Sequence, residues 1–170
     1  MKDTFETERL LLSEITLENG PFIFELVNTP GWIKYIGERN IRTLDDANKY
    51  IEKLLNTPKL IYWIVRLKGA LTEPGVITFI KREYLDHYDI GFAFLPQYAH
   101  KGYAFEASKE VLHYGLKELR MPAVVATTLA ENISSIRLLE KLGLQFEKGI
   151  TEGDLELQVY TTRKQKIENK

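Results

Sequence analysis

The chain of 170 residues is 44% hydrophobic, which suits one compact domain with a sizeable core. Its 23 basic and 24 acidic residues give a formal charge of -1, which excludes the strongly basic character typical of nucleic-acid-binding proteins. The first residues lack the apolar segment of a signal peptide, and no stretch approaches the roughly 18 apolar residues of a membrane span. We therefore expect a cytoplasmic protein without nucleic-acid or membrane partners.

The chain contains no cysteine, which excludes disulfides, a thiol nucleophile and an enzyme thioester. Its three histidines, His87, His100 and His113, are 13 residues apart. This spacing fits neither a helical pair nor a hairpin pair of metal ligands, so no metal site is predicted.

The first half of the chain is predicted to contain one strand, two helices and a hairpin. Thr16 and Thr43 are helix N-caps in this interpretation, and 29–31 (TPG) breaks the first helix. The assignment of 32–36 stays open. The predicted elements are a strand over 7–14, a helix after Thr16, a helix over 44–55, and hairpin strands over 62–67 and 75–81.

The second half alternates strands and helices. Apolar residues recur at helical spacing from Gly102 to Leu119, which predicts a long helix. The strands on either side of this helix should pair in parallel through a right-handed crossover. The predicted elements are strands over 88–95, 124–128 and 155–162 and helices over 102–119 and 133–142, within one domain spanning 1–165 and followed by a frayed tail, 166–170.

The turn between the strand 88–95 and the helix after it has the features of an anion site. A helix start leaves backbone N–H groups unsatisfied, Gly102 allows a ligand to approach the backbone, and Lys101 adds a cation. No acidic residue lies between Pro96 and Phe105. Neither a Walker nor a Rossmann glycine pattern is present. The alternative is that Gly102 only eases the strand into the helix.

Three segments of the chain carry a resemblance to a known family: TERLLL at 7–12, GFAFLP at 91–96 and TTLAENISSIRLLEKLGL at 127–144. Together with the turn, they resemble the GNAT superfamily of acetyl-CoA-dependent N-acetyltransferases. The resemblance extends over nearly the whole chain. It points to the branch that includes the ribosomal-protein amino-terminal (Ser/Ala) acetyltransferases.

This resemblance implies an α+β fold with about four helices and a mixed, mostly antiparallel sheet of six to seven strands, in which a central parallel pair splays apart. It implies acetyl-CoA as cosubstrate and no metal. Ala99 and His100 depart from the family's loop pattern, whereas Gly102 and Ala104 fit it. The residues expected to bind acetyl-CoA are Phe92, Phe94, Leu95, Ala99, His100, Lys101, Gly102, Tyr103, Ala104, Asn132 and Ser135.

The mechanism implied for a chain without cysteine is direct attack of an amine on the thioester in a ternary complex. Asp89 is the expected general base, and a backbone N–H near Phe94 or Leu95 is the expected oxyanion donor. Ser135 is the first choice for the acid that protonates the thiolate, and Tyr160 is the second. The alternatives are that Asp89 is a solvated strand-end residue, that water is the base, and that Asn132 and Ser135 only cap a helix.

The acceptor is expected to be a protein or peptide amino terminus, with a polyamine or amino sugar as the alternative. A catalytically silent acyl-CoA-binding module and a plain interaction domain are the other function classes. Exposed edge strands and late aromatics leave a homodimer open. Residues that could line an acceptor cleft are Glu14, Trp32, Tyr35, Glu38 and Tyr84.

Overall fold

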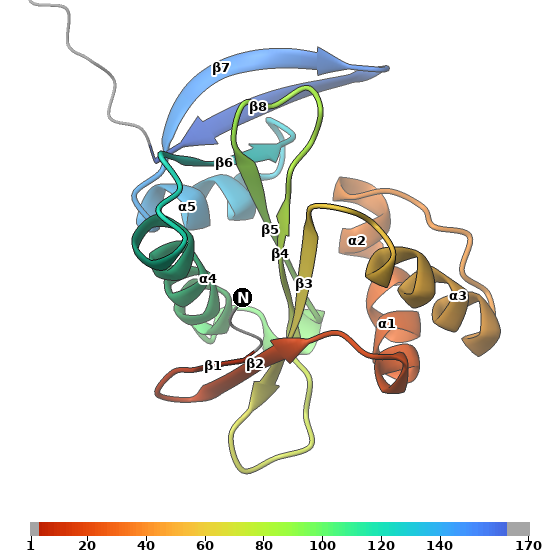
Figure 1. Cartoon of the computed structure of the whole chain (residues 1–170). Helices are drawn as coiled ribbons and strands as arrows, with labels where there is room; N and C mark the ends of the chain where they lie inside the picture. Colours follow the sequence, from red (N-terminus) through yellow and green to blue (C-terminus); the bar gives the residue numbers. More distant parts are fainter. Residues whose placement is uncertain (1–3, 163–170) are drawn as a thin grey trace, which may run out of the picture.

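An eight-stranded mixed sheet runs through the computed structural model, which describes residues 4–162 (Figure 1). The strands lie in the order β1-β2-β3-β4-β5-β6-β8-β7. They are β1 (Thr4–Glu6), β2 (Leu10–Glu14), β3 (Leu60–Leu67), β4 (Gly75–Ile80), β5 (Tyr88–Phe94), β6 (Val124–Thr128), β7 (Gln145–Glu152) and β8 (Leu155–Thr161). The α-helices are α1 (Gly20–Val27), α2 (Pro30–Tyr35), α3 (Leu44–Leu55), α4 (Tyr103–His113) and α5 (Ile133–Lys141).

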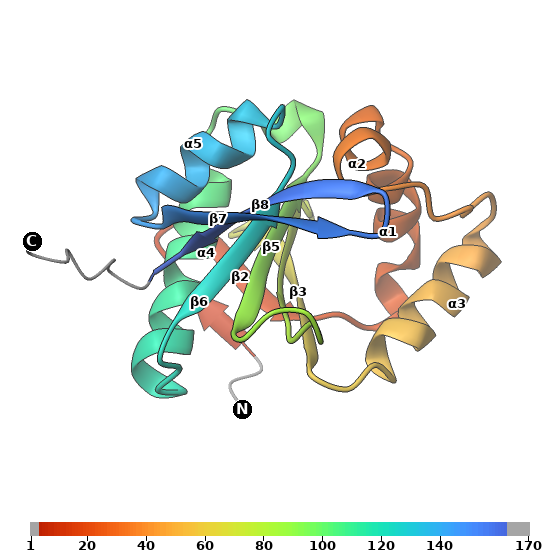
Figure 2. The same ribbon diagram turned by 90° about the horizontal axis from the view of Figure 1, so that it is seen from above.

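Helices cover both faces of the sheet, α1 to α3 on one side and α4 and α5 on the other (Figure 2). The central strand β3 contributes side chains to the hydrophobic cores on both faces of the sheet. Trp63 and Val65 belong to the core cluster that includes α4 and α5, whereas Tyr62 and Ile64 pack with α1 to α3. Since successive side chains of a strand point to opposite faces, a strand buried on both sides needs a continuous apolar run.

Several local predictions are confirmed. Thr43 caps α3 through a capping box, in which Thr43 Oγ1 accepts from the Asp46 N–H at 3.1 Å and Asp46 Oδ2 accepts from the Thr43 N–H at 3.0 Å. The hairpin β3–β4 is antiparallel. The strands β5 and β6 pair in parallel on either side of the crossover that contains α4. A π-helical turn, Tyr114–Glu118, continues α4 almost to the predicted end of the helix.

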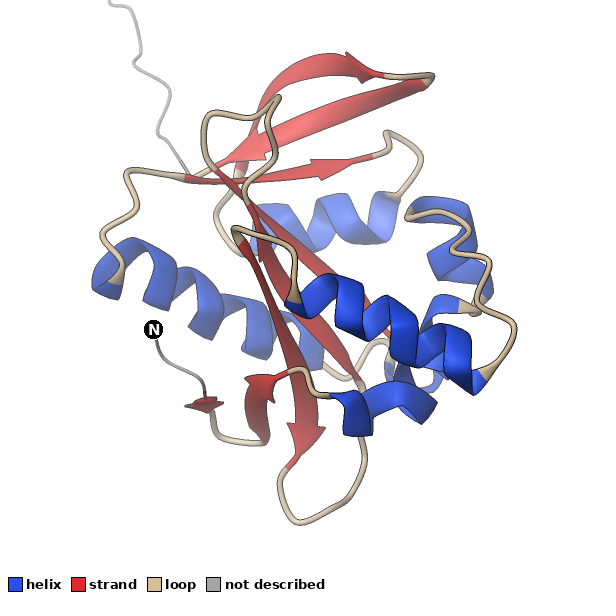
Figure 3. Ribbon diagram, turned by 45° about the vertical axis from the view of Figure 1, so that its right-hand side comes forward, coloured by secondary structure: helices blue, strands red, loops and turns tan. Residues whose placement is uncertain are grey.

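The structure corrects the predicted number of elements (Figure 3). There are eight strands instead of six to seven, because β1 and β7 were not expected. The strand β1 has only three residues, too few for an alternation to be recognised, and nearly all of β7 is exposed, so it carries no apolar alternation. The predicted strand 7–14 is shorter, since Thr7 to Arg9 form a turn closed by the Thr7 N–H to Leu10 carbonyl bond. Residues 30–35 form the helix α2, so the described residues contain five α-helices rather than about four.

The tail predicted over 166–170 lies outside the described residues. Within residues 4–162, no helix is both long and apolar enough to cross a membrane. The same residues contain no cluster of three side chains suited to holding a metal ion.

Candidate active site

The parallel strands β5 and β6 stay together for only two positions. Their register pairs Tyr88 with Val124 and Asp89 with Val125, and no pairing follows. The strand β5 nevertheless continues to Phe94 along its other neighbour, β4. The edge of β5 that faces β6 is therefore unpaired beyond Asp89. The resemblance implied a pair that splays apart after Phe94, and in the structure the two strands separate earlier, already after Asp89.

The ladder between β4 and β5 decides which backbone groups face this gap. The Leu95 N–H donates to the Pro74 carbonyl at 2.8 Å, so that pair is hydrogen bonded. In an antiparallel ladder such pairs alternate with pairs whose N–H and C=O groups point away from the partner strand. The backbone groups of Phe94 and Phe92 therefore point away from β4, toward the gap. Of the two expected oxyanion donors, only Phe94 has its N–H directed there.

The loop after β5 changes direction through two residues with positive φ. His100 has φ 60° and Gly102 has φ 80°, and α4 begins at the next residue, Tyr103. Gly102 is the N-cap and provides no side chain to bind the first N–H groups of α4. The N-terminus of α4 is therefore open to an anion, and the neighbouring Lys101 is exposed.

Glu106 in the first turn of α4 does not compete for that anion, because its carboxylate is held by the turn between β1 and β2. It accepts from Thr7 Oγ1 at 2.6 Å, the Arg9 N–H at 2.8 Å and Arg9 Nε at 2.7 Å. Partial burial acts to raise the pKa of Glu106, but the hydrogen bonds from Thr7 and Arg9 outweigh it and lower the pKa. Arg9 also donates to the Lys101 carbonyl at 2.9 Å and lies over the Tyr103 ring, so it fixes the loop.

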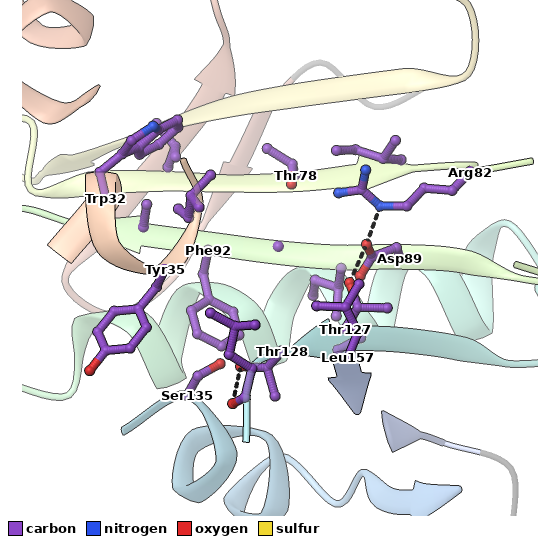
Figure 4. A pocket seen from close by; sticks show the side chains of 18 of the residues that line it. Trp32, Tyr35, Thr78, Arg82, Asp89, Phe92, Thr127, Thr128, Ser135 and Leu157 are labelled. Carbon is purple, nitrogen blue, oxygen red and sulfur yellow. Dashed lines mark hydrogen bonds and ion pairs between the residues drawn. The ribbon is translucent and has the colours of Figure 1, made fainter. Parts of the chain in front are cut away.

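Asp89, the expected base, is only 3% exposed and sits where the ladder of β5 and β6 ends (Figure 4). Its Oδ2 accepts from Arg82 Nε at 2.6 Å and from Thr127 Oγ1 at 3.1 Å, and its Oδ1 accepts from the Thr127 N–H at 3.2 Å. Burial raises the pKa of the Asp89 carboxyl, although Arg82 and Thr127 oppose this. Asp89 is thus not solvated, and its carboxylate joins the two strands.

Asn132 and Ser135 meet at the N-terminus of α5. Asn132 is the N-cap, and its Oδ1 accepts from the Ser135 N–H at 3.3 Å. The capping role is therefore present in the structure, and it uses the backbone of Ser135. The Ser135 hydroxyl makes no hydrogen bond with the rest of the described chain, and both residues line the pocket.

A pocket of about 320 Å³ opens between the two helical layers and is lined by residues of α2, α3, β3 to β6, α5 and the β7–β8 hairpin. Figure 4 shows Trp32 and Tyr35 at one end, Arg82 and Asp89 at the other, and Ser135 close to Phe92 and Thr128. Of the expected acceptor residues, Trp32, Tyr35 and Tyr84 line the pocket, whereas Glu14 and Glu38 do not.

Tyr160 is not among the residues that line the pocket. Its side chain is 5% exposed, its hydroxyl donates to Gln158 Oε1 at 3.2 Å, and its ring packs against Phe146. Burial raises its pKa, and Glu140 adds to the effect. The structure therefore brings Ser135, Asn132, Asp89 and Phe92 together and leaves Tyr160 apart from them.

Sequence reasoning missed the arginines of the site. Arg9 and Arg82 reach the loop and Asp89 from other parts of the chain, and Arg39 lines the pocket from the segment after α2. The turn that joins β4 to β5 places Arg82 and Asp89 seven residues apart, a spacing that could have suggested the pair. Nothing in the sequence indicates that Arg9 reaches a residue 92 positions away.

Comparisons with known proteins agree with this geometry. Residues 9–145 match the family model of the acetyltransferase (GNAT) domain. The N-acetyltransferase YnaD of Bacillus subtilis strain 168 is 34% identical over 154 residues, which cover 87% of this chain and 88% of that protein.

Solved structures show the same fold. A GNAT-family acetyltransferase from Bacillus anthracis is 30% identical with a TM-score of 0.79, covering 93% of this chain and 96% of that one. A spermidine N-acetyltransferase from Vibrio cholerae, solved with CoA and spermine, has a TM-score of 0.77 at 17% identity and covers 91% and 95%. With a family model that spans most of its length and a relative above 30% identity, the chain belongs to the GNAT family of acetyltransferases.

Proposed function

We propose that this protein is an acetyl-CoA-dependent N-acetyltransferase in which a primary amine attacks the thioester directly while both substrates are bound. The observation that carries the proposal is the gap between β5 and β6 beside the open start of α4. The backbone groups of Phe92 and Phe94 suit the amides of the pantetheine arm. The free N–H groups of α4, together with Lys101, suit the pyrophosphate.

In the proposed reaction the amine nitrogen forms a bond to the thioester carbonyl carbon and the carbon–sulfur bond breaks. The amine loses one proton, and the departing sulfur gains one. Acetyl-CoA supplies an activated acyl group. The Phe94 N–H stabilises the negative charge on the carbonyl oxygen, and the Ser135 hydroxyl gives its proton to the sulfur. The proton that the amine loses passes to water, and Ser135 regains a proton from water. Direct attack fits a chain without cysteine.

Two observations bear on the proton acceptor. Asp89 lines the pocket, and burial raises the pKa of its carboxyl, which makes the carboxylate a stronger base. Its oxygens are already engaged by Arg82 and Thr127, which favours a positioning role and leaves water as the base. We propose Asp89 as a positioning residue.

Proteins with this fold act on different acceptors. A ribosomal-protein-S5-alanine acetyltransferase from Vibrio fischeri shares the fold at 15% identity, and the Vibrio cholerae enzyme named above is a spermidine acetyltransferase. At such identities the likeness supports the fold alone, so neither the ribosomal-protein branch nor a polyamine is carried over.

The test of the proposed function has two stages. Acetyl-CoA should raise the melting temperature, because it binds the folded state. Release of CoA thiol is then measured with a panel of amines that includes amino acids, spermidine and a short peptide, against a reaction without amine. An N-acetyltransferase releases CoA only when an amine is present. Stabilisation without amine-dependent release would indicate an acyl-CoA-binding module, and no stabilisation would overturn the proposal.

A further inference from the structure

Two buried hydrogen-bond donors line the end of the pocket next to α2. Tyr62 and Trp32 are each 6% exposed, and neither Tyr62 Oη nor Trp32 Nε1 has a hydrogen-bond partner among the described residues. Buried polar atoms are nearly always satisfied in folded proteins. An indole N–H can only donate, so the missing partner at Trp32 must accept a hydrogen bond.

The guanidinium of Arg39 is a third donor at this end of the pocket. Its Cζ lies 5.9 Å from the centre of the Trp32 ring, and the side chain is exposed. Arg39 forms no ion pair with any carboxylate of residues 4–162, because the neighbouring Glu38 pairs with Arg42 at 2.9 Å. The positive charge of Arg39 is therefore not neutralised by an ion pair with these residues, and it is exposed, whereas the other two donors are buried.

Tyr62 is held in its donating, protonated form. Burial raises its pKa well above the ordinary value, the nearby Tyr50 adds to the effect, and Arg39 opposes it. Arg39 lies against the Trp32 ring, and Trp32, Arg39 and Tyr62 all line this pocket. We treat these three donors as one cluster, with a positive charge at its exposed side.

The carboxylates that line the pocket lie elsewhere. Asp89 is at the opposite end and is bound by Arg82, and Glu152 belongs to the exposed strand β7. A polyamine would therefore bring a second ammonium group to a cluster that contains Arg39. Like charges repel, and neither an indole N–H nor a guanidinium can accept a hydrogen bond from an ammonium.

We propose that the acceptor is a small amine that also carries a carboxylate, an amino acid with an apolar side chain, and that Arg39, Trp32 and Tyr62 bind this carboxylate. The volume of about 320 Å³ lies at the lower end of the range for small-molecule sites. Apolar walls next to the cluster come from Ile36 and Leu54. This inference rests on the proposed N-acetyltransferase function.

The experiment compares matched amines with the full chain and saturating acetyl-CoA. The pairs are phenylalanine with phenethylamine and methionine with 3-(methylthio)propylamine, and phenylalanine amide, spermidine and a short peptide complete the set. Since a charge-assisted hydrogen bond is stronger than a neutral one, we expect kcat/KM to be about tenfold higher for each acid than for its decarboxylated partner.

Substitutions test whether Arg39 and Tyr62 cause the preference for the acids. Arg39→Gln should raise KM for the acids about tenfold and leave the decarboxylated amines nearly unchanged, and Tyr62→Phe should act in the same direction. Arg39 is exposed, so its variant is expected to fold. Lys53→Gln is the control, because Lys53 is an exposed cation next to Leu54 of the pocket wall and does not itself line the pocket. It should leave both members of each pair unchanged.

The outcomes separate this inference from the proposed function. If spermidine, the peptide or the decarboxylated amines are acetylated as fast as the acids, the N-acetyltransferase function stands and the carboxylate inference is wrong. Equal losses for both members of a pair in Arg39→Gln would also overturn it. If no amine of the set releases CoA, both proposals fail.

Discussion

The candidate site beside β5 has two halves, which are built from different parts of the chain. On the side of α4, the groups available to a ligand are the backbone N–H and C=O of Phe92 and Phe94 and the first N–H groups after Gly102. On the side of α2, they are side chains, Trp32, Arg39 and Tyr62 among them. A backbone site tolerates side-chain changes as long as the backbone conformation persists, whereas each substitution alters a side-chain site. Substitutions on the α4 side should therefore change KM for acetyl-CoA, and substitutions on the α2 side should change KM for the amine.

Ser135 stands where the two halves meet, and its substitution should have the largest effect. Ser135→Ala should lower kcat about 100-fold, because general acid catalysis contributes at least that much. The cap of α5 uses the Ser135 backbone, so acetyl-CoA binding and the melting temperature should hardly change. Steady-state kinetics over a range of pH measure the effect. Ser134→Ala, at the exposed neighbouring position, is the control, and equal kcat values in the two variants would exclude Ser135 as the acid.

Asp89 joins β5 to β6 where their ladder ends, at the opposite end of the pocket from Trp32. Asp89→Asn removes the charge opposite Arg82 and should lower the free energy of unfolding by about 2 kcal/mol, since breaking a buried pair leaves an uncompensated charge. The gap should then widen or close, which raises KM for acetyl-CoA. Urea denaturation and kinetics measure both effects.

A base at Asp89 predicts a different pattern. Stability and KM would be retained, and kcat would fall and lose its dependence on pH near the carboxyl pKa. Asp86→Asn is the matched control, because Asp86 is exposed in the turn before β5. A variant of Asp89 that keeps the wild-type stability would contradict the positioning role.

Gly102 tests whether the α4 side depends on backbone conformation. Gly102→Ala places a Cβ on a residue with φ 80°, 3.2 Å from Arg9 Nη2. The left-handed conformation costs an alanine about 1 kcal/mol, and the shift of the loop should raise KM for acetyl-CoA about tenfold without affecting the amine. Gly143→Ala is the control, with φ 91° and no atom within 4 Å of the added Cβ. Gly143→Ala should lower the free energy of unfolding by a similar amount and leave KM for acetyl-CoA unchanged. An equal rise in this KM would show that backbone strain alone is responsible.

The same contrast explains what the sequence could predict. The parallel pair and the open start of α4 follow one another locally along the chain, so spacing and helix-start signals predicted them, and the family resemblance of the next segment added Asn132 and Ser135. On the α2 side, the sequence suggested Trp32 and Tyr35 but not Arg39 and Tyr62, which are brought together only by packing of α2 and α3 on β3. The orphaned state of Tyr62 Oη and Trp32 Nε1 is a property of the fold and leaves no mark in the sequence.

Exposed segments escaped prediction for a related reason. The strand β7 is almost entirely exposed and gains its order from pairing with β8, so its residues show no apolar period. Leu95 shows that the sequence does not tell which way a backbone N–H points. It was an expected oxyanion donor beside Phe94, but the alternation of the antiparallel ladder directs its N–H to the Pro74 carbonyl.

Glu106 gives the smallest effect expected and should be confined to the α4 side. Its folded pKa is lowered below the ordinary value of 4.5, so its contribution to stability is present above that value and is lost as the pH falls through the folded pKa. Glu106→Gln should therefore lower the free energy of unfolding by about 1 kcal/mol at neutral pH, and the difference from wild type should shrink in acid. Urea denaturation at several pH values measures this difference, with Glu110→Gln on the same helix as control.

The effect of Glu106→Gln on substrate binding should also be small. Because Arg9 is released from Glu106 but still bonds to the Lys101 carbonyl, KM for acetyl-CoA should rise only about twofold and KM for the amine should stay constant. A stability difference that persists at acid pH would show that the carboxylate charge is not what holds the loop.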